Sequence, residues 1–225
     1  MEDGPKRKET IVVVGAHPDD ETLGCGGAVA RRIQEGREVV VVVLTPGERL
    51  YSIVLGIDTD PTPEEVGRIR QEETRRSTRI LGVKPENVLF LGYGDGKLAD
   101  REAEATGELA RILRERRPVE VWSLSEYEHH PDHVAASRIA RAACARAGGT
   151  ARLLYYIVSL KYGLTLDAVP LKFTGVDISA YLPQKTRAVH CFRSHLGTLS
   201  KAQKGPMWQN ADNYLRPEEL FAAGD

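Results

Sequence analysis

The chain alternates short runs of β-branched residues with amphipathic stretches of helical length, and this alternation constrains its fold more than any other feature. The short runs lie at residues 11–15, 39–44, 88–91, 119–124 and 152–158, and the amphipathic stretches between them at residues 20–34, 63–81, 101–117 and 132–147. Continuous apolar runs are typical of strands buried on both faces of a parallel sheet. The alternation therefore predicts an α/β fold of the Rossmann-like, doubly wound type with a mostly parallel sheet.

The expected strand order, numbered along the chain, is 3-2-1-4-5, an arrangement common to doubly wound sheets. We assign residues 1–160 to this α/β core. After residue 160 the pattern breaks into short pieces, including residues 176–181 and a predicted helix at residues 183–192. We therefore expect residues 161–225 to form a small, irregular C-terminal extension packed on the same domain.

A long connection follows the second predicted strand, at residues 45–62. Loops of this length inside a domain are usually functional or disordered. Leu50, Tyr51 and residues 53–55 are too apolar for a solvated linker. We expect the segment to form a lid or rim over a site, to pack against a neighbouring subunit, or to remain mobile.

Charge balance and cysteine count exclude several classes of function. The 31 Lys and Arg residues nearly cancel the 32 Asp and Glu residues, whereas a binder of nucleic acid or anionic membranes needs a basic surplus. The 3 widely spaced cysteines predict neither a disulfide framework nor a cysteine zinc site. No apolar run approaches the ~20 residues that span a bilayer, and residues 1–10 contain no signal-peptide core. We expect a cytoplasmic protein with no membrane span and no nucleic-acid partner.

A cluster of chemistry-bearing side chains follows the first predicted strand. The sequence Gly-Ala-His-Pro-Asp-Asp-Glu places His17 beside the carboxylates of Asp19, Asp20 and Glu21. Because the residue before a proline favours extended conformations, Pro18 keeps His17 out of the helix. His17 and Asp20 can then converge on one point while Asp19 points elsewhere. One aspartate here would be explained as a helix N-cap, but a histidine with three acids predicts a metal or proton-transfer site.

A second cluster follows the fourth predicted strand. His129, His130 and His133 are half of the chain's 6 histidines. Histidine is the commonest zinc ligand, and three His or Asp ligands leave a position open for water. Spacing alone leaves two ligand pairs open, because His129 and His133 are four residues apart whereas His130 and His133 are three apart around a helix start.

Topology predicts that the two clusters share one site. In doubly wound sheets, sites form at the carboxyl ends of strands where the strand order reverses, and strands one and four are neighbours at that point in the order 3-2-1-4-5. The alternative there is a dinucleotide site. The fingerprint of such a site is G-x-G-x-x-G, and after Gly15 its second glycine would fall at position 17, which is His17. The fingerprint is therefore absent at this strand end. The glycines at residues 24–27 are better explained by close helix–sheet packing.

Together, Ala-His-Pro-Asp-Asp-Glu and His-Pro-Asp-His resemble the motifs of the LmbE-like/PIG-L family of zinc-dependent de-N-acetylases. The resemblance implies a Zn2+ ion held by His17, Asp20 and His133, which resolves the choice between the two histidine pairs. It implies Asp19 as the general base, and His130 as the residue that stabilises the oxyanion or donates a proton. It is also compatible with a homo-oligomer.

The implied reaction hydrolyses the N-acetyl group of an N-acetylglucosamine-containing substrate to a free amine and acetate. Zinc would lower the pKa of its water to about 7, Asp19 would accept the proton, and zinc with protonated His130 would stabilise the tetrahedral oxygen. By the same resemblance, Arg70 and Asp95 bind sugar hydroxyls. Without it, Arg70 would be assigned to a solvated helix face and Asp95 to a glycine turn.

Two other classes of function stay open: a metal-dependent hydrolase of another bond, such as a phosphoester, and a non-catalytic sugar-binding or metal-binding protein. The sequence does not name the aglycone of the sugar. In the C-terminal segment that the family often carries, Phe192 and His195 replace the characteristic residues. We expect His195 to be structural or exposed, and Trp208 and Tyr214 to anchor the tail. Tyr127 is a candidate for a hydroxyl beside the oxyanion.

Overall fold

Five parallel strands form the centre of the computed structural model, which describes residues 8–224. They are β1 (Thr10–Gly15), β2 (Glu38–Val43), β3 (Val88–Phe90), β4 (Glu120–Leu124) and β5 (Arg152–Tyr156). β1 and β2 are runs of valine and isoleucine that are buried almost throughout, because helices cover both faces of the sheet. The predicted α/β class with a mostly parallel sheet is confirmed.

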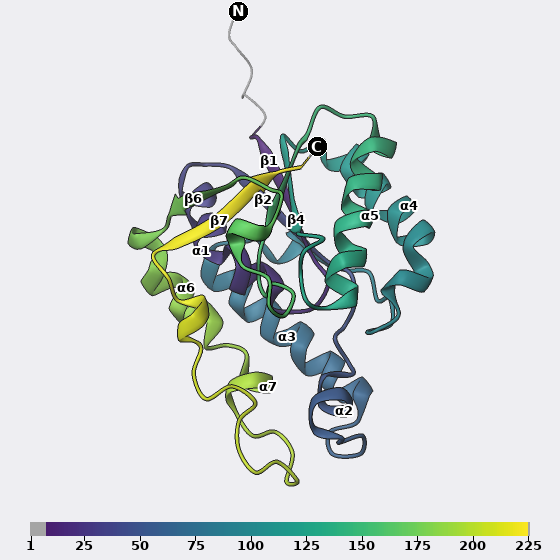
Figure 1. Ribbon diagram of the computed structural model, residues 1–225, viewed down its shortest axis with the longest axis vertical. Coiled ribbons are helices and arrows are strands. Elements are labelled where there is room, and N and C mark those ends of the chain that lie inside the picture. The colour runs from purple at the N-terminus through teal and green to yellow at the C-terminus, as the bar shows by residue number, and fades with distance from the viewer. Residues whose placement is uncertain (1–7, 225) are drawn as a thin grey trace, which may run out of the picture.

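The helices form two layers, one on each face of the sheet (Figure 1). Helices α1 (Asp20–Gln34), α3 (Pro63–Leu81) and α6 (Leu182–Val189) pack against one another on one face. On the other face α4 (Glu102–Arg116) packs against α5 (Pro131–Ala147). This two-layer cover is the arrangement expected for a doubly wound sheet.

The sheet is larger than the sequence predicted. Its order is β3-β2-β1-β4-β5-β7-β6, so the predicted order 3-2-1-4-5 describes only its parallel part. Strands β6 (Phe173–Asp177) and β7 (Glu218–Ala223) add an antiparallel part, in which β7 pairs with β5 and β6 pairs with β7. The prediction of an irregular C-terminal extension is therefore wrong. The sequence of β7, Glu-Glu-Leu-Phe-Ala-Ala, has little strand propensity of its own, and pairing with β5 overrides it. The division at residue 160 stays a prediction.

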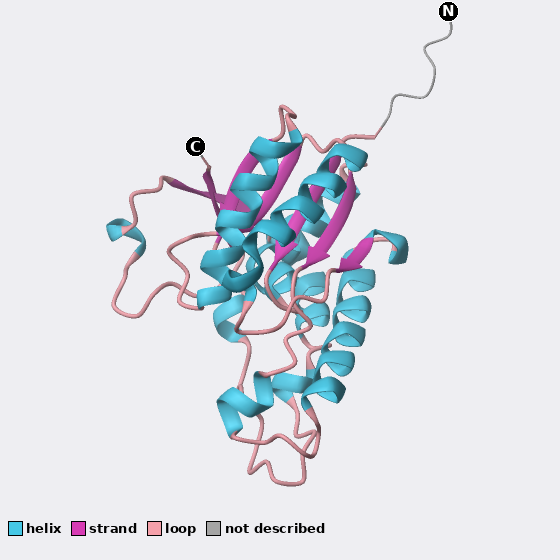
Figure 2. Cartoon of the chain, turned by 90° about the vertical axis from the view of Figure 1, so that its right-hand side faces the viewer, coloured by secondary structure: helices cyan, strands magenta, loops and turns pink. Residues whose placement is uncertain are grey.

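Two short helices lie beyond the carboxyl edge of the sheet, on the side to which the strand arrows point in Figure 2. Helix α2 (Leu50–Leu55) lies within the connection predicted as a loop, and α7 (Arg193–Leu196) follows α6. Tyr51 is fully buried, and its hydroxyl donates to the backbone oxygen of Ser194 at 3.0 Å. This hydrogen bond joins α2 to α7 beyond the carboxyl edge of the sheet, although the two helices are far apart in the sequence.

Helix α1 approaches the sheet closely through its glycines. A Cβ atom at Gly24 would lie 2.4 Å from the ring of Tyr156, and one at Gly27 would lie 2.5 Å from Ile178. Real Cβ atoms do not approach neighbours so closely. The explanation of residues 24–27 by close packing is therefore supported. The helix is kinked at Cys25, which is fully buried.

A buried ion pair joins α6 to β7, and both of its side chains also bond to the backbone of α1. The Nζ atom of Lys185 lies 2.6 Å from Oε1 of Glu219 and donates to the backbone oxygen of Leu23 at 2.8 Å. Both charged side chains are at most 3% exposed. The carboxylate of Glu219 also accepts hydrogen bonds from the backbone N–H groups of Gly27 and Ala28, next to the kink. The ion pair thus holds the kinked helix and the added strands together.

Within residues 8–224, no helix combines the length and the hydropathy that crossing a membrane requires. The expectation that residues 1–10 contain no signal-peptide core concerns a segment of which residues 1–7 lie outside the described part of the chain. The cytoplasmic location stays a prediction.

Candidate metal centre and active site

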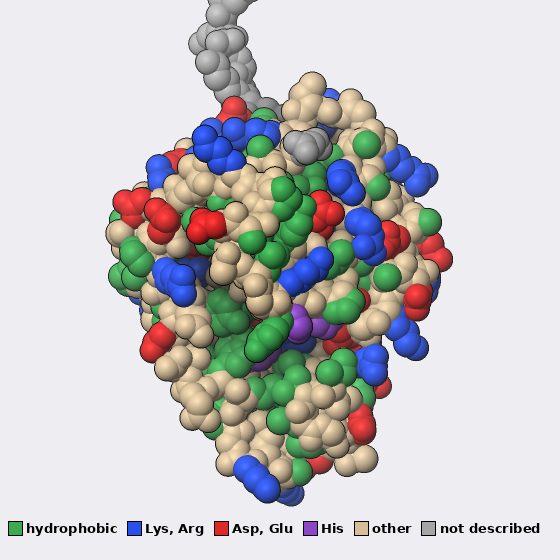
Figure 3. All heavy atoms as spheres, in the orientation of Figure 1, with side chains coloured by type: hydrophobic (Ala, Val, Ile, Leu, Met, Phe, Trp, Pro, Cys, Tyr) green, Lys and Arg blue, Asp and Glu red, His purple; other side chains and the backbone are tan. Residues whose placement is uncertain are grey.

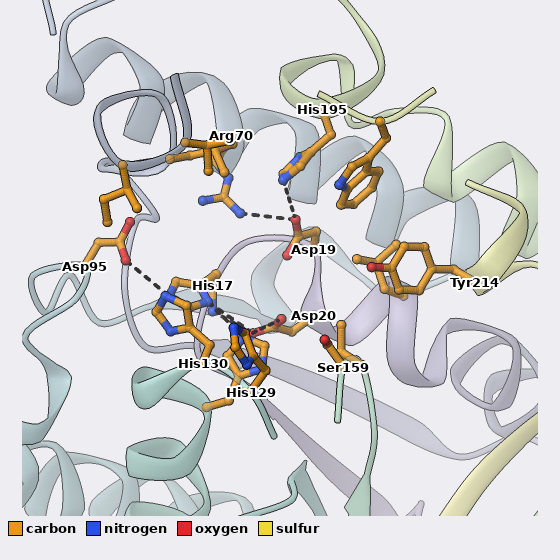
Figure 4. A pocket seen from close by; sticks show the side chains of 17 residues that line it. His17, Asp19, Asp20, Arg70, Asp95, His129, His130, Ser159, His195 and Tyr214 are labelled. Carbon is orange, nitrogen blue, oxygen red and sulfur yellow. Dashed lines mark hydrogen bonds and ion pairs between the residues drawn. The ribbon is translucent and has the colours of Figure 1, made fainter. Parts of the chain in front are cut away.

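The carboxyl ends of the neighbouring strands β1 and β4 bring the two predicted clusters together (Figure 4). Nδ1 of His17 lies 3.1 Å from Nε2 of His133, although 116 residues separate them in the sequence. Asp20 completes the group, with Oδ1 at 3.2 Å from His133 Nε2 and Oδ2 at 3.8 Å from His17 Nδ1. All three residues are at least nine-tenths buried.

The spacing of these atoms fits a tetrahedral metal ion. Bonds of 2.0–2.2 Å at tetrahedral angles place neighbouring ligand atoms about 3.3–3.6 Å apart. The separations of 3.1 and 3.2 Å are slightly shorter than this range, and that of 3.8 Å, which is measured to the other oxygen of Asp20, is slightly wider. Ligand atoms of His17, His130 and His133 also lie within 4.8 Å of one another. The donor set of nitrogen and oxygen atoms therefore suits a divalent metal.

Carboxylates lie behind both central histidines. Nε2 of His17 faces Asp95 Oδ1 at 3.2 Å and Asp132 Oδ2 at 3.4 Å, and Nδ1 of His133 faces Glu128 Oε2 at 3.2 Å. Metal-binding histidines usually direct their second ring nitrogen to such a group, which fixes the ring and its tautomer. Each ring therefore presents one nitrogen to a carboxylate and the other to the shared point beside Asp20.

Strong negative charge surrounds the two rings. Burial lowers the pKa of His17, but Asp132, Asp95 and Asp20 outweigh it and raise that pKa to about 9. Burial likewise opposes the carboxylates around His133, which raise its pKa to about 10. The pKa of Asp20 lies well below its usual range because the two histidines outweigh the effect of burial. A site that attracts protons this strongly also attracts a metal cation.

Glu128 is fully buried and is a contact that sequence reasoning missed. Its Oε1 accepts from the backbone N–H of Val158 and its Oε2 from that of Ser159, both at 2.7 Å. The same Oε2 faces His133. Glu128 therefore connects the chain after β5 to the candidate metal ligand. The only sequence signal was the acidic Glu-Tyr-Glu segment before the histidines.

Asp19 lies beside this group in a rare backbone conformation. Its φ angle is +125°, a region that side chains other than glycine avoid and that is concentrated at functional sites. Its Oδ2 accepts from Arg70 Nη2 at 3.1 Å and lies 3.4 Å from His195 Nε2 (Figure 4). Burial raises the pKa of Asp19 to about 7, although Arg70 opposes the rise.

Arg70 is buried rather than part of a solvated helix face. Besides Asp19, its guanidinium donates to the backbone oxygen of Gly47 at 2.7 Å and to that of Pro18 at 2.9 Å. It therefore ties the long connection after β2 to the loop after β1. It also lines the cavity beside the candidate metal ligands, and its contact to a sugar stays a prediction.

His195 is buried beside Asp19, a position that sequence reasoning missed. Its Nδ1 lies 3.2 Å from Oγ of Ser194, and that hydroxyl donates to Glu73 at 2.6 Å. Burial holds the pKa of His195 well below its ordinary value, so the ring is neutral. Since the hydroxyl donates to Glu73, it accepts from His195 Nδ1, and Nε2 is the nitrogen that meets Asp19. A single histidine in a four-residue helix gave no pattern to read.

His130 caps the start of α5, where its Nδ1 accepts from the backbone N–H of Asp132 at 3.1 Å. Burial and the neighbouring rings of His17 and His133 lower the pKa of His130 to about 4. The ring is therefore neutral, with its proton on Nε2, and the protonated form expected from the sequence is not favoured. His129 lies at the cavity wall.

Asp95 and Asp132 organise the loop after β3. Asp132 accepts from the backbone N–H groups of Gly96 and Leu98, at 2.7 and 3.2 Å. Asp95 Oδ2 accepts from the backbone N–H of Arg49 at 3.0 Å, and its Oδ1 faces His17. Asp95, the predicted sugar contact, lines the cavity next to the candidate metal ligands.

A cavity of about 270 Å3 opens over His17, Asp20 and His133, the candidate metal cluster. Figure 3 shows histidine at the floor of a hollow surrounded mainly by hydrophobic side chains. Ile53 and Val54 of α2 form part of its wall, and Trp208 and Tyr214 form another part. The two aromatic residues therefore line the site besides anchoring the tail. Tyr127 is not among the described residues that line this cavity.

Comparisons with known proteins identify relatives of this chain. Residues 12–144 match the protein family described as PIG-L, GlcNAc-PI de-N-acetylase. The chain is 30% identical to the 1D-myo-inositol 2-acetamido-2-deoxy-alpha-D-glucopyranoside deacetylase of Mycobacterium sp. (strain JLS), over 96% of this chain and 83% of that protein.

Two solved structures share the fold. One is N,N'-diacetylchitobiose deacetylase from Pyrococcus horikoshii, with a TM-score of 0.73 and 23% identity over 97% of this chain and 85% of that one. The other is GalB, the 4-carboxy-2-hydroxymuconate hydratase of Pseudomonas putida KT2440, with a TM-score of 0.68 and 26% identity over 82% of this chain and 78% of that one.

Proposed function

Because the chain belongs to the PIG-L family of GlcNAc-PI de-N-acetylases, we propose that it is a zinc-dependent deacetylase that hydrolyses the N-acetyl group of an N-acetylglucosamine-containing substrate. The observation that carries the proposal is the convergence of His17, Asp20 and His133 beside the strained Asp19 at the junction of β1 and β4. The products are a free amine on the sugar and acetate.

We assign the metal to His17, Asp20 and His133. Imidazole and carboxylate ligands suit zinc, and three protein ligands leave a position open for substrate or water. A bound zinc ion supplies Lewis acidity at this point, which polarises the amide carbonyl and makes water a stronger nucleophile at neutral pH.

Asp19 is the proposed general base. Its pKa of about 7 suits a group that accepts a proton from the attacking water and later returns it to the amine nitrogen. Arg70 donates to the reacting carboxylate, and the ring of His195 lies against its other side. Through Ser194, Glu73 in turn fixes the His195 ring.

His130 is the proposed donor to the developing oxyanion. Because its Nδ1 accepts from Asp132, its neutral ring carries the proton on Nε2 and can donate it in a hydrogen bond without being an imidazolium. Donors fixed before the reaction stabilise the charge that develops in the transition state. Asp95 remains the proposed contact to a sugar hydroxyl.

The proposal is tested with the full chain loaded with zinc and a panel of acetamido sugars. We expect acetate and free amine to form in equal amounts from N-acetylglucosamine derivatives. Phosphoester hydrolysis without acetate release would refute the proposal, as would bound zinc with no turnover of any acetamido sugar. Water addition to an unsaturated acid, the reaction named for GalB, is assayed in parallel. Sedimentation tests the predicted homo-oligomer.

A further inference from the structure

Helix α2 presents an apolar surface at the mouth of the cavity. Ile53 is 55% exposed and Val54 is 58% exposed, and both line the same cavity as the metal cluster. Single exposed hydrophobic residues are common on protein surfaces. Ile53 and Val54 differ from such isolated residues, because they are adjacent and border a cavity with a charged floor. They therefore form an apolar rim around a polar centre.

The opposite wall of the cavity is also apolar. Trp208 stacks on the ring of His195, with ring centroids 4.0 Å apart, and lies 5.4 Å from the ring of Tyr214. Leu23 and Val158 continue this wall. The close view shows Tyr214 directed toward the cavity from the side opposite Asp95 (Figure 4). A group that leaves the metal cluster outward therefore passes between two apolar surfaces.

An anionic aglycone finds no free lysine or arginine on these walls. Among the described residues that line the cavity, Arg70 is the only lysine or arginine. Its guanidinium is already bonded to Gly47, Pro18 and Asp19. A carboxylate or phosphate beside the sugar would thus be desolvated with no free lysine or arginine to meet it, which is unfavourable.

We propose that the substrate is an N-acetylglucosaminide whose aglycone is uncharged and apolar, an alkyl or aryl group that lies between Ile53 and Val54 on one side and Trp208 on the other. This inference rests on the proposed deacetylase function and adds the class of its aglycone. The occupant is substrate rather than a second copy of the chain, because the apolar rim continues into the cavity that holds the metal cluster.

The probes are N-acetylglucosaminides with methyl, butyl and hexyl aglycones, together with a myo-inositol conjugate and a carboxylate-bearing conjugate. The measured quantity is kcat/KM for acetate release by the zinc-loaded full chain. Each methylene that becomes buried is worth about 0.8 kcal/mol, or about fourfold. We expect kcat/KM to rise at least tenfold from the methyl to the hexyl compound, and to be lower for the inositol and carboxylate conjugates than for the hexyl compound.

A matched control lies on the same helix. The double variant Ile53→Ser/Val54→Ser should reduce the hexyl-to-methyl ratio of kcat/KM to below threefold. Leu55→Ser removes a neighbouring side chain that is 36% exposed but does not line the cavity, and this variant should keep the native ratio. Because the ratio is taken within each variant, changes in overall activity cancel.

The outcomes separate the two proposals. Acetate release from the methyl compound with a flat alkyl series, or with a preference for the inositol or carboxylate conjugate, overturns the apolar aglycone and leaves the deacetylase function standing. No acetate release from any compound overturns the deacetylase function. If Leu55→Ser lowers the hexyl-to-methyl ratio as much as the double variant does, the preference for hexyl depends on general surface hydrophobicity, for example through self-association. This result also overturns the inference.

Discussion

Glu128→Gln replaces a carboxylate that lies behind the candidate ligand His133. In the native chain, Oε1 accepts from Val158, while Oε2 accepts from Ser159 and also faces His133 Nδ1. A glutamine side chain has only one oxygen and carries hydrogen donors on its nitrogen. Whichever way it is turned, its NH2 group meets at least one backbone N–H donor.

The size of the effect follows from these contacts. If the amide oxygen stays near Val158, the NH2 group opposes both Ser159 and the N–H of His133, so the ring loses the acceptor that orients it. Loss of such an outer partner usually lowers metal affinity by about 10- to 100-fold, which corresponds to about 1.4–2.7 kcal/mol. The unpaired buried donor costs a further 1–3 kcal/mol, roughly, of folding stability.

The assay is a competition titration of zinc against a chelator of known affinity, with purified full-length chain at pH 7.5. Glu126→Gln is the matched control, because Glu126 is two residues earlier in the same segment and, among the described residues, makes no hydrogen bond or ion pair with the candidate metal ligands. Circular dichroism and thermal unfolding establish that each variant is folded at the titration temperature. We expect weaker zinc binding in Glu128→Gln and native binding in Glu126→Gln.

Two results would refute this reasoning. A native zinc affinity in folded Glu128→Gln would show that the carboxylate does not orient His133. An equal loss of affinity in both variants would show that the negative charge of the segment matters, rather than the contact to the ring.

Further outcomes follow from the same contacts. His133→Ala should lose most of its metal by elemental analysis while His129→Ala retains it, and the opposite pattern would show that the ligand choice is wrong. Asp19→Asn should keep the metal and lose about 10²–10⁴-fold in kcat, whereas near-native kcat in the zinc-loaded variant would exclude the general-base role. The pKa values of about 9 for His17 and about 10 for His133 lie above neutral pH, so metal must displace protons and should bind more tightly as the pH rises from 6 to 8. Calorimetry in buffers of different ionisation enthalpy should detect a net release of protons on metal binding, and a value near zero contradicts this account. Lys185→Met leaves a buried carboxylate without its cation and should lower the free energy of unfolding in urea by about 3–5 kcal/mol; a loss below about 1 kcal/mol would show that the pair contributes little.

The parallel part of the fold could be predicted because its information is local. Buried parallel strands are read directly as valine-rich runs, and Gly82 and Pro118 mark the ends of the helices between them. The topology of such sheets then predicts that the ends of β1 and β4 are neighbours, and the structure confirms that neighbourhood. His17 and His133 could be brought together in this way without any knowledge of side-chain contacts.

The remaining features depend on contacts that no local pattern encodes. β7 becomes a strand through its pairing with β5 and through the ion pair of Glu219 with Lys185. His195 enters the site only because Tyr51 and Glu73, from distant helices, hold the short α7 in place. Such residues carry no spacing rule, so an isolated histidine there looks like any other.

β7 lies between β5 and β6 in the sheet but follows both in the sequence. The sheet therefore cannot be completed in the order in which its strands are synthesised. β6 leaves the ribosome first, but it pairs with β7, which is made about forty residues later. Trp208 and Tyr214 lie in the stretch between these two strands. The parallel strands and the metal-binding loops can therefore assemble while the far wall of the cavity is still unfixed. The part of the site that contacts the rest of the substrate matures last, after the part that is proposed to do the chemistry.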